Sequence, residues 1–125
     1  MPSLTTSWRL NLDRGPNWLI VRLSPESGEG CQESELAEQI AELLEQHFTD
    51  RVVLELEEVE ALSSQLLSQL LKLHRRVVAR GGLMRLCGVS PANRAVLKTN
   101  RLDRRFPHFA DRFEAVRGYR PTQPR

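Results

Sequence analysis

Two adjacent hydroxyl side chains, Ser63 and Ser64, stand where an apolar run gives way to a long helical pattern. The first turn of a helix has free backbone N–H groups and the positive end of the dipole, so it stabilises an anion placed there. A serine in that turn is therefore suited to carry a phosphate. A serine at the same place can also do no more than cap the helix. The residue types leave both interpretations open.

No other group of residues has the spacing of a catalytic or metal site. His47, His74 and His108 are far apart, and no pair has the four-residue spacing of a zinc-binding helix. The chain has no phosphate-binding or dinucleotide-binding glycine pattern. Four glutamates could suggest paired carboxylates, but carboxylates alternating on a strand and turn are usually solvated: Glu55, Glu57, Glu58 and Glu60. We therefore predict no enzyme activity, no catalytic residue, no metal and no cofactor.

The serine pair lies inside a predicted strand–helix–strand unit. Residues 51–56 and 83–87 are apolar runs typical of strands, and Gly81-Gly82 ends a helix predicted over residues 64–80. The buried side of that helix is expected to carry Leu66, Leu67, Leu70, Leu71, Leu73, Val77 and Val78. The wetter side is expected to carry Gln65, Ser68, Gln69, Lys72, Arg75, Arg76 and Arg80. Such a crossover makes its two strands parallel.

Shorter elements flank this unit. Before it we expect a hairpin of strands 8–12 and 18–23 around a turn at 13–17, a flexible loop over 24–30 and an acidic helix over 34–48. After it we expect a helix over 92–99, a short strand at 108–109 and a last helix over 110–116, with Ser90 and Pro91 starting the first of these helices. The side chains expected in the core are Trp8, Trp18, Leu36, Ile40, Leu43, Leu44, Phe48, Val96, Leu97, Leu102, Phe106, Phe113 and Val116.

The predicted fold class is α/β. We expect one domain over residues 8–117, built from a mixed sheet of about four to five strands packed by about four helices. Residues 1–7 are expected to be frayed and residues 118–125 to form a flexible tail. No apolar run approaches the roughly 20 residues of a membrane span, and we expect no export signal, because the N-terminal residues lack a basic start followed by an apolar core. Cys31 and Cys87 suggest no disulfide framework, so we expect a reducing cytoplasm.

Charge is distributed unevenly along the chain. Residues 1–60 hold 4 basic and 13 acidic side chains, a net charge of −9. Residues 61–125 hold 14 basic and 3 acidic side chains, a net charge of +11, which together give the overall +2. One explanation is that the acidic and basic segments form solvated helix faces that attract each other across the fold. The other is that the basic segment forms a surface for an anionic partner.

Several segments taken together resemble the STAS domain, a family named for sulphate transporters and anti-sigma factor antagonists. The resemblance spans roughly residues 8–116 and is closest to the free-standing bacterial antagonists. The segments that carry it are residues 53–59 (Val-Leu-Glu-Leu-Glu-Glu-Val) followed by Leu62-Ser63-Ser64, then residues 70–76, 80–91 and 97–106. In such antagonists the loop before the long helix typically reads Asp-Ser-Ser-Gly or Asp-Ser-Thr-Gly. Here Ser63 stands where Asp is usual and Leu66 where Gly is usual.

The resemblance implies a partner-switching regulator without enzymatic activity. Unphosphorylated protein would bind an anti-sigma factor serine kinase, phosphorylation at Ser64 (alternatively Ser63) would block binding, and a serine phosphatase would reverse it. The expected contact surface is Glu57, Glu58, Glu60, Ser63, Ser64, Gln65 and Ser68. We expect no binding to a membrane and no direct binding to DNA. The sequence leaves open whether the protein forms a homodimer. The alternative is a phosphorylation-independent scaffold, or a module that senses a nucleotide or other ligand through Arg75, Arg76, Arg101, Arg104 and Arg105.

Overall fold

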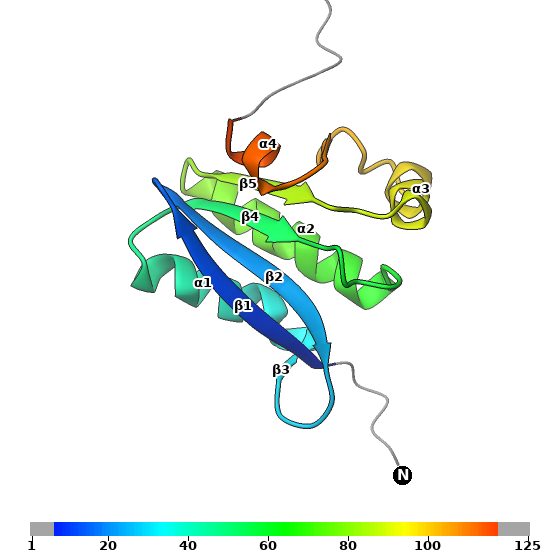
Figure 1. Ribbon diagram of the computed structural model, residues 1–125, viewed down its shortest axis with the longest axis horizontal. Helices are drawn as coiled ribbons and strands as arrows, with labels where there is room; N and C mark the ends of the chain where they lie inside the picture. The colour runs from blue at the N-terminus through cyan, green and yellow to red at the C-terminus, as the bar shows by residue number, and fades with distance from the viewer. Residues whose placement is uncertain (1–6, 118–125) are drawn as a thin grey trace, which may run out of the picture.

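A computed structural model describes residues 7–117, in which a twisted sheet is packed by helices on both faces (Figure 1). The described part of the chain forms one six-stranded sheet in the order β3-β1-β2-β4-β5-β6. Its strands are β1 (Ser7–Gly15), β2 (Trp18–Glu26), β3 (Cys31–Gln32), β4 (Arg51–Glu55), β5 (Leu83–Cys87) and β6 (His108–Phe109). Its helices are α1 (Leu36–Gln46), preceded by a short 3₁₀ turn (Glu33–Glu35), α2 (Ser64–Ala79), α3 (Pro91–Thr99) and α4 (Arg112–Arg117).

The predicted α/β class and mixed sheet are confirmed, with one strand more than expected. The strands β1 and β2 are antiparallel, whereas β2, β4, β5 and β6 run parallel to one another. The extra strand is β3, which pairs with β1 through Cys31 and Trp8. A two-residue strand of this kind has no hydrophobic period of its own, so only tertiary pairing reveals it.

The hairpin is longer than its hydrophobic pattern suggests. Its register runs from Ser7 opposite Glu26 to Gly15 opposite Trp18, so the turn is only Pro16-Asn17. Ser7, expected in the frayed N-terminus, is the first residue of β1, and the supposed loop residues Ser24 to Glu26 belong to β2. Ladder hydrogen bonds use the backbone, so polar residues extend these strands without an apolar signal. The predicted tail and residues 1–6 lie outside the described residues.

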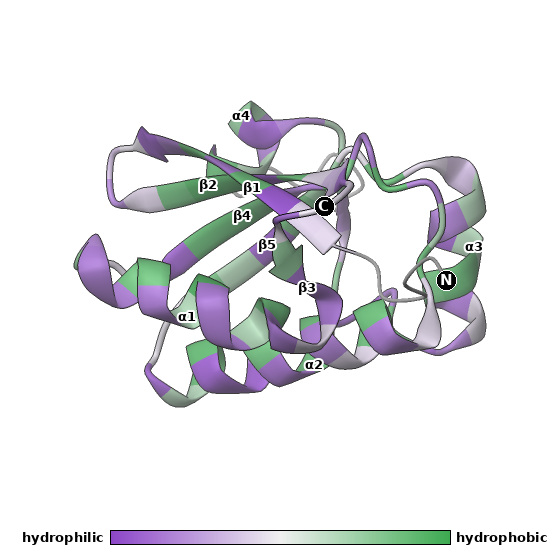
Figure 2. Cartoon of the chain, turned by 90° about the horizontal axis from the view of Figure 1, so that it is seen from below, coloured by the Kyte–Doolittle hydropathy of each residue, from purple (hydrophilic) through white to green (hydrophobic). Residues whose placement is uncertain are grey.

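Hydrophobic residues fill both sides of the sheet (Figure 2). On one side α1 and α2 cover a large core that includes Leu19, Leu54 and Leu70. On the other side α4 covers a smaller core of Trp18, Ile20, Val53, Cys87, Phe109 and Ala115. The crossover from β4 through α2 to β5 has the predicted parallel arrangement. Gly81 ends α2 with a positive φ of 76°, and Ser90 caps α3 with Pro91 in its first turn, both as predicted.

Three side chains expected in the core are exposed instead. Phe48 is 94% exposed because α1 ends at Gln46 and the chain then turns through a left-handed φ of 55°. Val78 is 53% exposed, since its neighbour Val77 occupies the core position of that helical turn. Phe113 is 68% exposed because Ala115 is the α4 residue that packs against the sheet. None of the helices in the described part is long and apolar enough to cross a bilayer.

Candidate functional site

The hydroxyl of Ser63 is fixed by two hydrogen bonds. Its Oγ accepts from the backbone N–H of Leu66 at 3.1 Å, which makes Ser63 the N-cap of α2. The same hydroxyl donates to Glu33 Oε1 at 3.3 Å. Glu33 is only 5% exposed, and its other carboxylate oxygen accepts from the indole N–H of Trp8 at 3.0 Å. One of the two predicted hydroxyls is thus a structural cap tied to the buried carboxylate of Glu33.

Ser64 differs from Ser63 although it is the next residue. It is the first residue of α2 and is exposed to solvent. No hydrogen bond of its side chain is found within residues 7–117, and the residue belongs to the first helical turn, whose leading backbone N–H groups have no partner within the helix. An anion on Ser64 would therefore gain from those donors and from the dipole of a 16-residue helix.

A buried amide holds the loop that leads to Ser63. Asn93, which is 2% exposed on α3, accepts from the backbone N–H of Leu62 at 3.1 Å. It also donates to the backbone carbonyl of Val59 at 2.9 Å. Side-chain bonds to two backbone groups restrict the loop, because breaking them would leave buried polar groups unpaired. Sequence reasoning missed Asn93, and only its position near the start of a helix hinted at a role.

The seven residues predicted for partner contact are all exposed. They gather where β4 ends and α2 begins: Glu57, Glu58, Glu60, Ser63, Ser64, Gln65 and Ser68. Arg22 from β2 approaches Glu58 at 3.4 Å and Glu57 at 3.9 Å, so two of the three carboxylates are partly compensated. The surface is polar and acidic, and it suits a partner that presents cations or hydrogen-bond donors.

Comparison with known proteins identifies this arrangement. A family model for the STAS domain matches residues 11–115. The chain belongs to the STAS domain family. Among curated protein sequences, none is significantly similar to it.

Solved structures share the fold of this STAS domain at low sequence identity. An anti-sigma factor antagonist from Mycobacterium paratuberculosis is 20% identical, with a TM-score of 0.70 over 90% of this chain and 93% of that one. The phosphorylated form of the Bacillus cell fate determinant SpoIIAA is 20% identical, with a TM-score of 0.63 over 89% and 99%. A chain of the stressosome, described as a signal integration and transduction hub, is 16% identical, with a TM-score of 0.64 over 86% and 94%.

One predicted surface carboxylate of the STAS domain, Glu55, is in fact buried. It is 3% exposed and accepts two hydrogen bonds from Arg112 of α4, at 2.7 and 2.9 Å. Arg22 Nε lies 3.4 Å from the same carboxylate, and Arg112 also reaches Asp13 of β1 at 2.5 Å. The hydrogen bond from Arg112 is the main cause that lowers the pKa of Asp13. The expectation that Glu55 is solvated is wrong, because a cation 57 residues away in sequence pairs with it.

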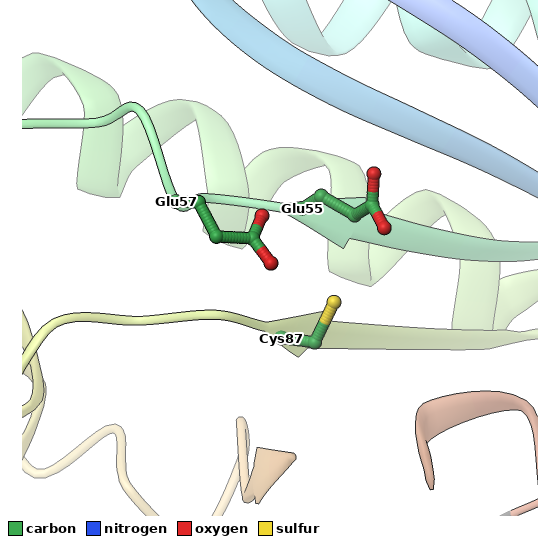
Figure 3. Close-up of side chains that lie close together, drawn as sticks. All are labelled: Glu55, Glu57 and Cys87. Atoms are coloured by element: carbon green, nitrogen blue, oxygen red, sulfur yellow. The ribbon is translucent and has the colours of Figure 1, made fainter. Parts of the chain in front are cut away.

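Glu55, Glu57 and Cys87 bring two carboxylates and a thiol together (Figure 3). Their ligand atoms all lie within 4.8 Å of one another, at the carboxyl ends of β4 and β5. Burial, followed by the charges of Glu57 and Glu55, raises the pKa of Cys87 to about 12. The thiol is therefore protonated at neutral pH, and both oxygens of Glu55 already bind Arg112. This donor set suits a metal ion poorly, because metals bind the thiolate form of cysteine.

Burial should make the two cysteines of the native domain differ in reactivity. Cys87 is fully buried and its thiol is protonated, whereas Cys31 is partly exposed. We expect iodoacetamide at about pH 8 to alkylate Cys31 at least roughly tenfold faster than Cys87, as read by peptide mass spectrometry. In urea both should react at similar rates. Equal labelling of the two in native protein would contradict the packing around Cys87.

The remaining predicted residues do not form one site in the described part of the domain. His47 Nδ1 lies 3.2 Å from Arg14, His74 packs edge-on to Phe106 at 5.2 Å, and His108 lies in β6. Arg76 pairs with Glu38 at 3.4 Å. The other basic residues named for the alternative function are exposed and make no ion pair within residues 7–117: Arg75, Arg101, Arg104 and Arg105.

Gln69 is a further departure from the sequence pattern. It was expected on the wetter side of α2, yet it is 8% exposed. Its side-chain oxygen accepts from the backbone N–H of Ala37 at 2.8 Å, at the start of α1. That N–H has no partner within its own helix, so Gln69 satisfies it and joins α2 to α1. A helical period cannot reveal such a residue, because it marks polar side chains as solvent-facing.

Proposed function

We propose that this STAS domain is a partner-switching regulator of the anti-sigma factor antagonist type. In the unphosphorylated form it binds an anti-sigma factor serine kinase. Phosphorylation of Ser64 prevents this binding, and a serine phosphatase restores it. Membership of the STAS family supports the proposal, as does the fold shared with solved proteins named as anti-sigma factor antagonists.

The difference between Ser63 and Ser64 is the observation that carries the proposal. A kinase must reach a hydroxyl and align it with a nucleoside triphosphate, so the acceptor has to be exposed and free to turn. Ser64 meets this condition, whereas the hydroxyl of Ser63 is committed to Leu66 and Glu33. In the transfer, the Ser64 oxygen bonds to the terminal phosphorus, its proton passes to a base on the kinase, and the nucleoside diphosphate leaves. We therefore favour Ser64 over Ser63 as the acceptor.

The unusual residues of the loop fit the same arrangement. Ser63 supplies no carboxylate next to the acceptor Ser64. The carboxylate of Glu33, however, lies 3.3 Å from the hydroxyl of Ser63. Leu66 is fully buried and anchors the first turn of α2 in the core. The acceptor is thus held by a packed side chain and a capped helix start, and the loop before it is held by Asn93.

A phosphate on Ser64 would change the contact surface by charge and size. It adds about −1.5 to −2 charges at pH 7. Those charges join the three exposed carboxylates of Glu57, Glu58 and Glu60. Burying the dianion against a packed partner costs desolvation energy, while the free form keeps it stabilised by the helix start. The phosphorylated domain is therefore expected to leave the kinase.

Mass spectrometry on protein purified from its native host tests the acceptor directly. We expect intact-mass analysis to show a single added phosphate in part of the population, and fragment spectra to place it on Ser64. The Ser64→Ala variant, produced in the same host, should lack that species. The control variant Ser63→Ala should keep the phosphate on Ser64, although its helix cap is lost. A phosphate on Ser63 or on another residue would overturn the assignment.

The alternative function is a phosphorylation-independent scaffold or ligand-sensing module. Four exposed arginines without an ion pair in the described region favour a basic contact surface: Arg75, Arg101, Arg104 and Arg105. Absence of phosphate under several growth conditions would favour this function over the switch. In that case Ser63 would cap α2 and Ser64 would be an ordinary exposed residue.

A further inference from the structure

A cavity of about 170 Å³ lies beside α3, and neither Ser63 nor Ser64 lines it. Its apolar wall consists of Val89, Leu97 and Phe106, which are 5%, 3% and 2% exposed. Its polar wall consists of Arg94, Lys98, Asp103 and His108. The cavity therefore combines an apolar interior with a charged mouth, the usual composition of a small-molecule site.

The charges at the mouth favour an anion. Arg94 and Lys98 are four residues apart on α3, so they project from the same side of the helix. The side chain of neither residue makes an ion pair or a hydrogen bond within residues 7–117, and both residues are exposed. Asp103 is the one acidic residue among those lining the cavity. The mouth is therefore net positive and offers donors that the domain itself does not use.

His108 adds a neutral polar group to this wall. Burial first, and then the charge of Arg94, lower the pKa of His108, while Glu114 acts in the opposite direction. The imidazole is therefore neutral at physiological pH and can donate one hydrogen bond. It stands at the start of β6, directly opposite Leu86 of β5.

The position of the cavity in the fold is also that of a ligand site. Val89 comes two positions after Cys87, the last residue of β5, and His108 pairs with Leu86 near the end of that strand. In open α/β sheets, ligands bind in crevices outside the carboxyl ends of parallel strands. Here residues of α3 and of the segment after it line the cavity.

We infer that this cavity binds a small organic carboxylate with an apolar body, such as an aromatic or branched-chain acid. The apolar body contacts Val89, Leu97 and Phe106, and the carboxylate binds Arg94 and Lys98. A ligand with many charges, such as a nucleotide, fits less well, because the volume is small and most of the wall is apolar. The inference stands whether or not Ser64 is phosphorylated.

Titration of the full chain with benzoate, followed by amide NMR, tests the site. We expect saturable shifts centred on Val89, Arg94, Lys98 and His108. Benzyl alcohol, which has the same ring without the charge, should bind at least about tenfold more weakly, since it loses the charge-assisted hydrogen bonds. Equal binding of the two probes, or benzoate shifts scattered over the surface, would overturn the inference.

Charge-neutral variants separate the cavity from the general positive surface. Arg94→Gln and Lys98→Gln should each weaken benzoate binding about fivefold to tenfold. Arg104→Gln removes the same charge from an exposed residue outside the cavity lining and should change affinity less than about twofold. The three substitutions are at exposed positions, so the folded spectrum should persist. Equal weakening by Arg104→Gln would assign the effect to bulk charge and contradict the site.

Discussion

Ser64→Asp will weaken binding to the cognate anti-sigma factor kinase by about 100-fold or more. Aspartate places a permanent negative charge at the first position of α2, in the middle of the proposed contact surface. The free domain tolerates this charge well, because the helix start stabilises it. The complex with the kinase does not tolerate the charge, because the aspartate loses its hydration water when it is buried against the packed partner. Isothermal titration calorimetry with the purified kinase measures the loss.

Two matched variants decide whether the effect belongs to this position. Ser64→Ala should bind the kinase within about threefold of the wild type, because one exposed hydroxyl contributes little. Gln46→Glu adds one negative charge at the exposed C-terminal end of α1 and should also leave binding unchanged. Equal affinity of Ser64→Asp and the wild type would exclude the phosphorylation switch. Equal weakening by Gln46→Glu would point to overall charge instead.

Arg112→Met will lower the free energy of unfolding of this domain by about 3 kcal/mol. The substitution leaves the carboxylate of Glu55 buried without its two-point partner. Arg22 approaches Glu55 at 3.4 Å and compensates only in part. Asp13 also loses a contact, so α4 loses its ion pairs to β1 and β4. Urea unfolding followed by circular dichroism measures the change.

Removing the buried charge should restore much of that stability. The double variant Glu55→Gln with Arg112→Met has no buried carboxylate left unpaired, so it should recover at least about half of the loss. Arg117→Met is the control within the same helix, since Arg117 is exposed and makes no ion pair in the described region. It should change stability by less than about 0.5 kcal/mol. If Arg112→Met lowers the free energy of unfolding no more than Arg117→Met does, the ion pair between Arg112 and Glu55 does not stabilise the packing of α4.

The local features of this protein follow from its sequence. Hydrophobic period and glycine placement identified β4, α2 and β5, and with them the parallel crossover. Cap chemistry identified the starts of α2 and α3, where Ser63 and Ser90 accept backbone N–H bonds. These features depend on residues within a few positions of one another. The order of motifs also indicated the STAS family and directed attention to Ser64.

Tertiary structure decided which polar side chains are buried and which residues form hydrogen bonds with them. Glu33 meets Ser63 across 30 positions, Asn93 meets Leu62 across 31 and Glu55 meets Arg112 across 57. A periodic pattern assigns such side chains to solvent, because it records polarity and not the partner that compensates it. The choice between Ser63 and Ser64 has the same origin. Both serines are exposed, but the hydroxyl of Ser63 is bonded to Glu33 and to the N–H of Leu66, whereas the side chain of Ser64 makes no hydrogen bond within residues 7–117.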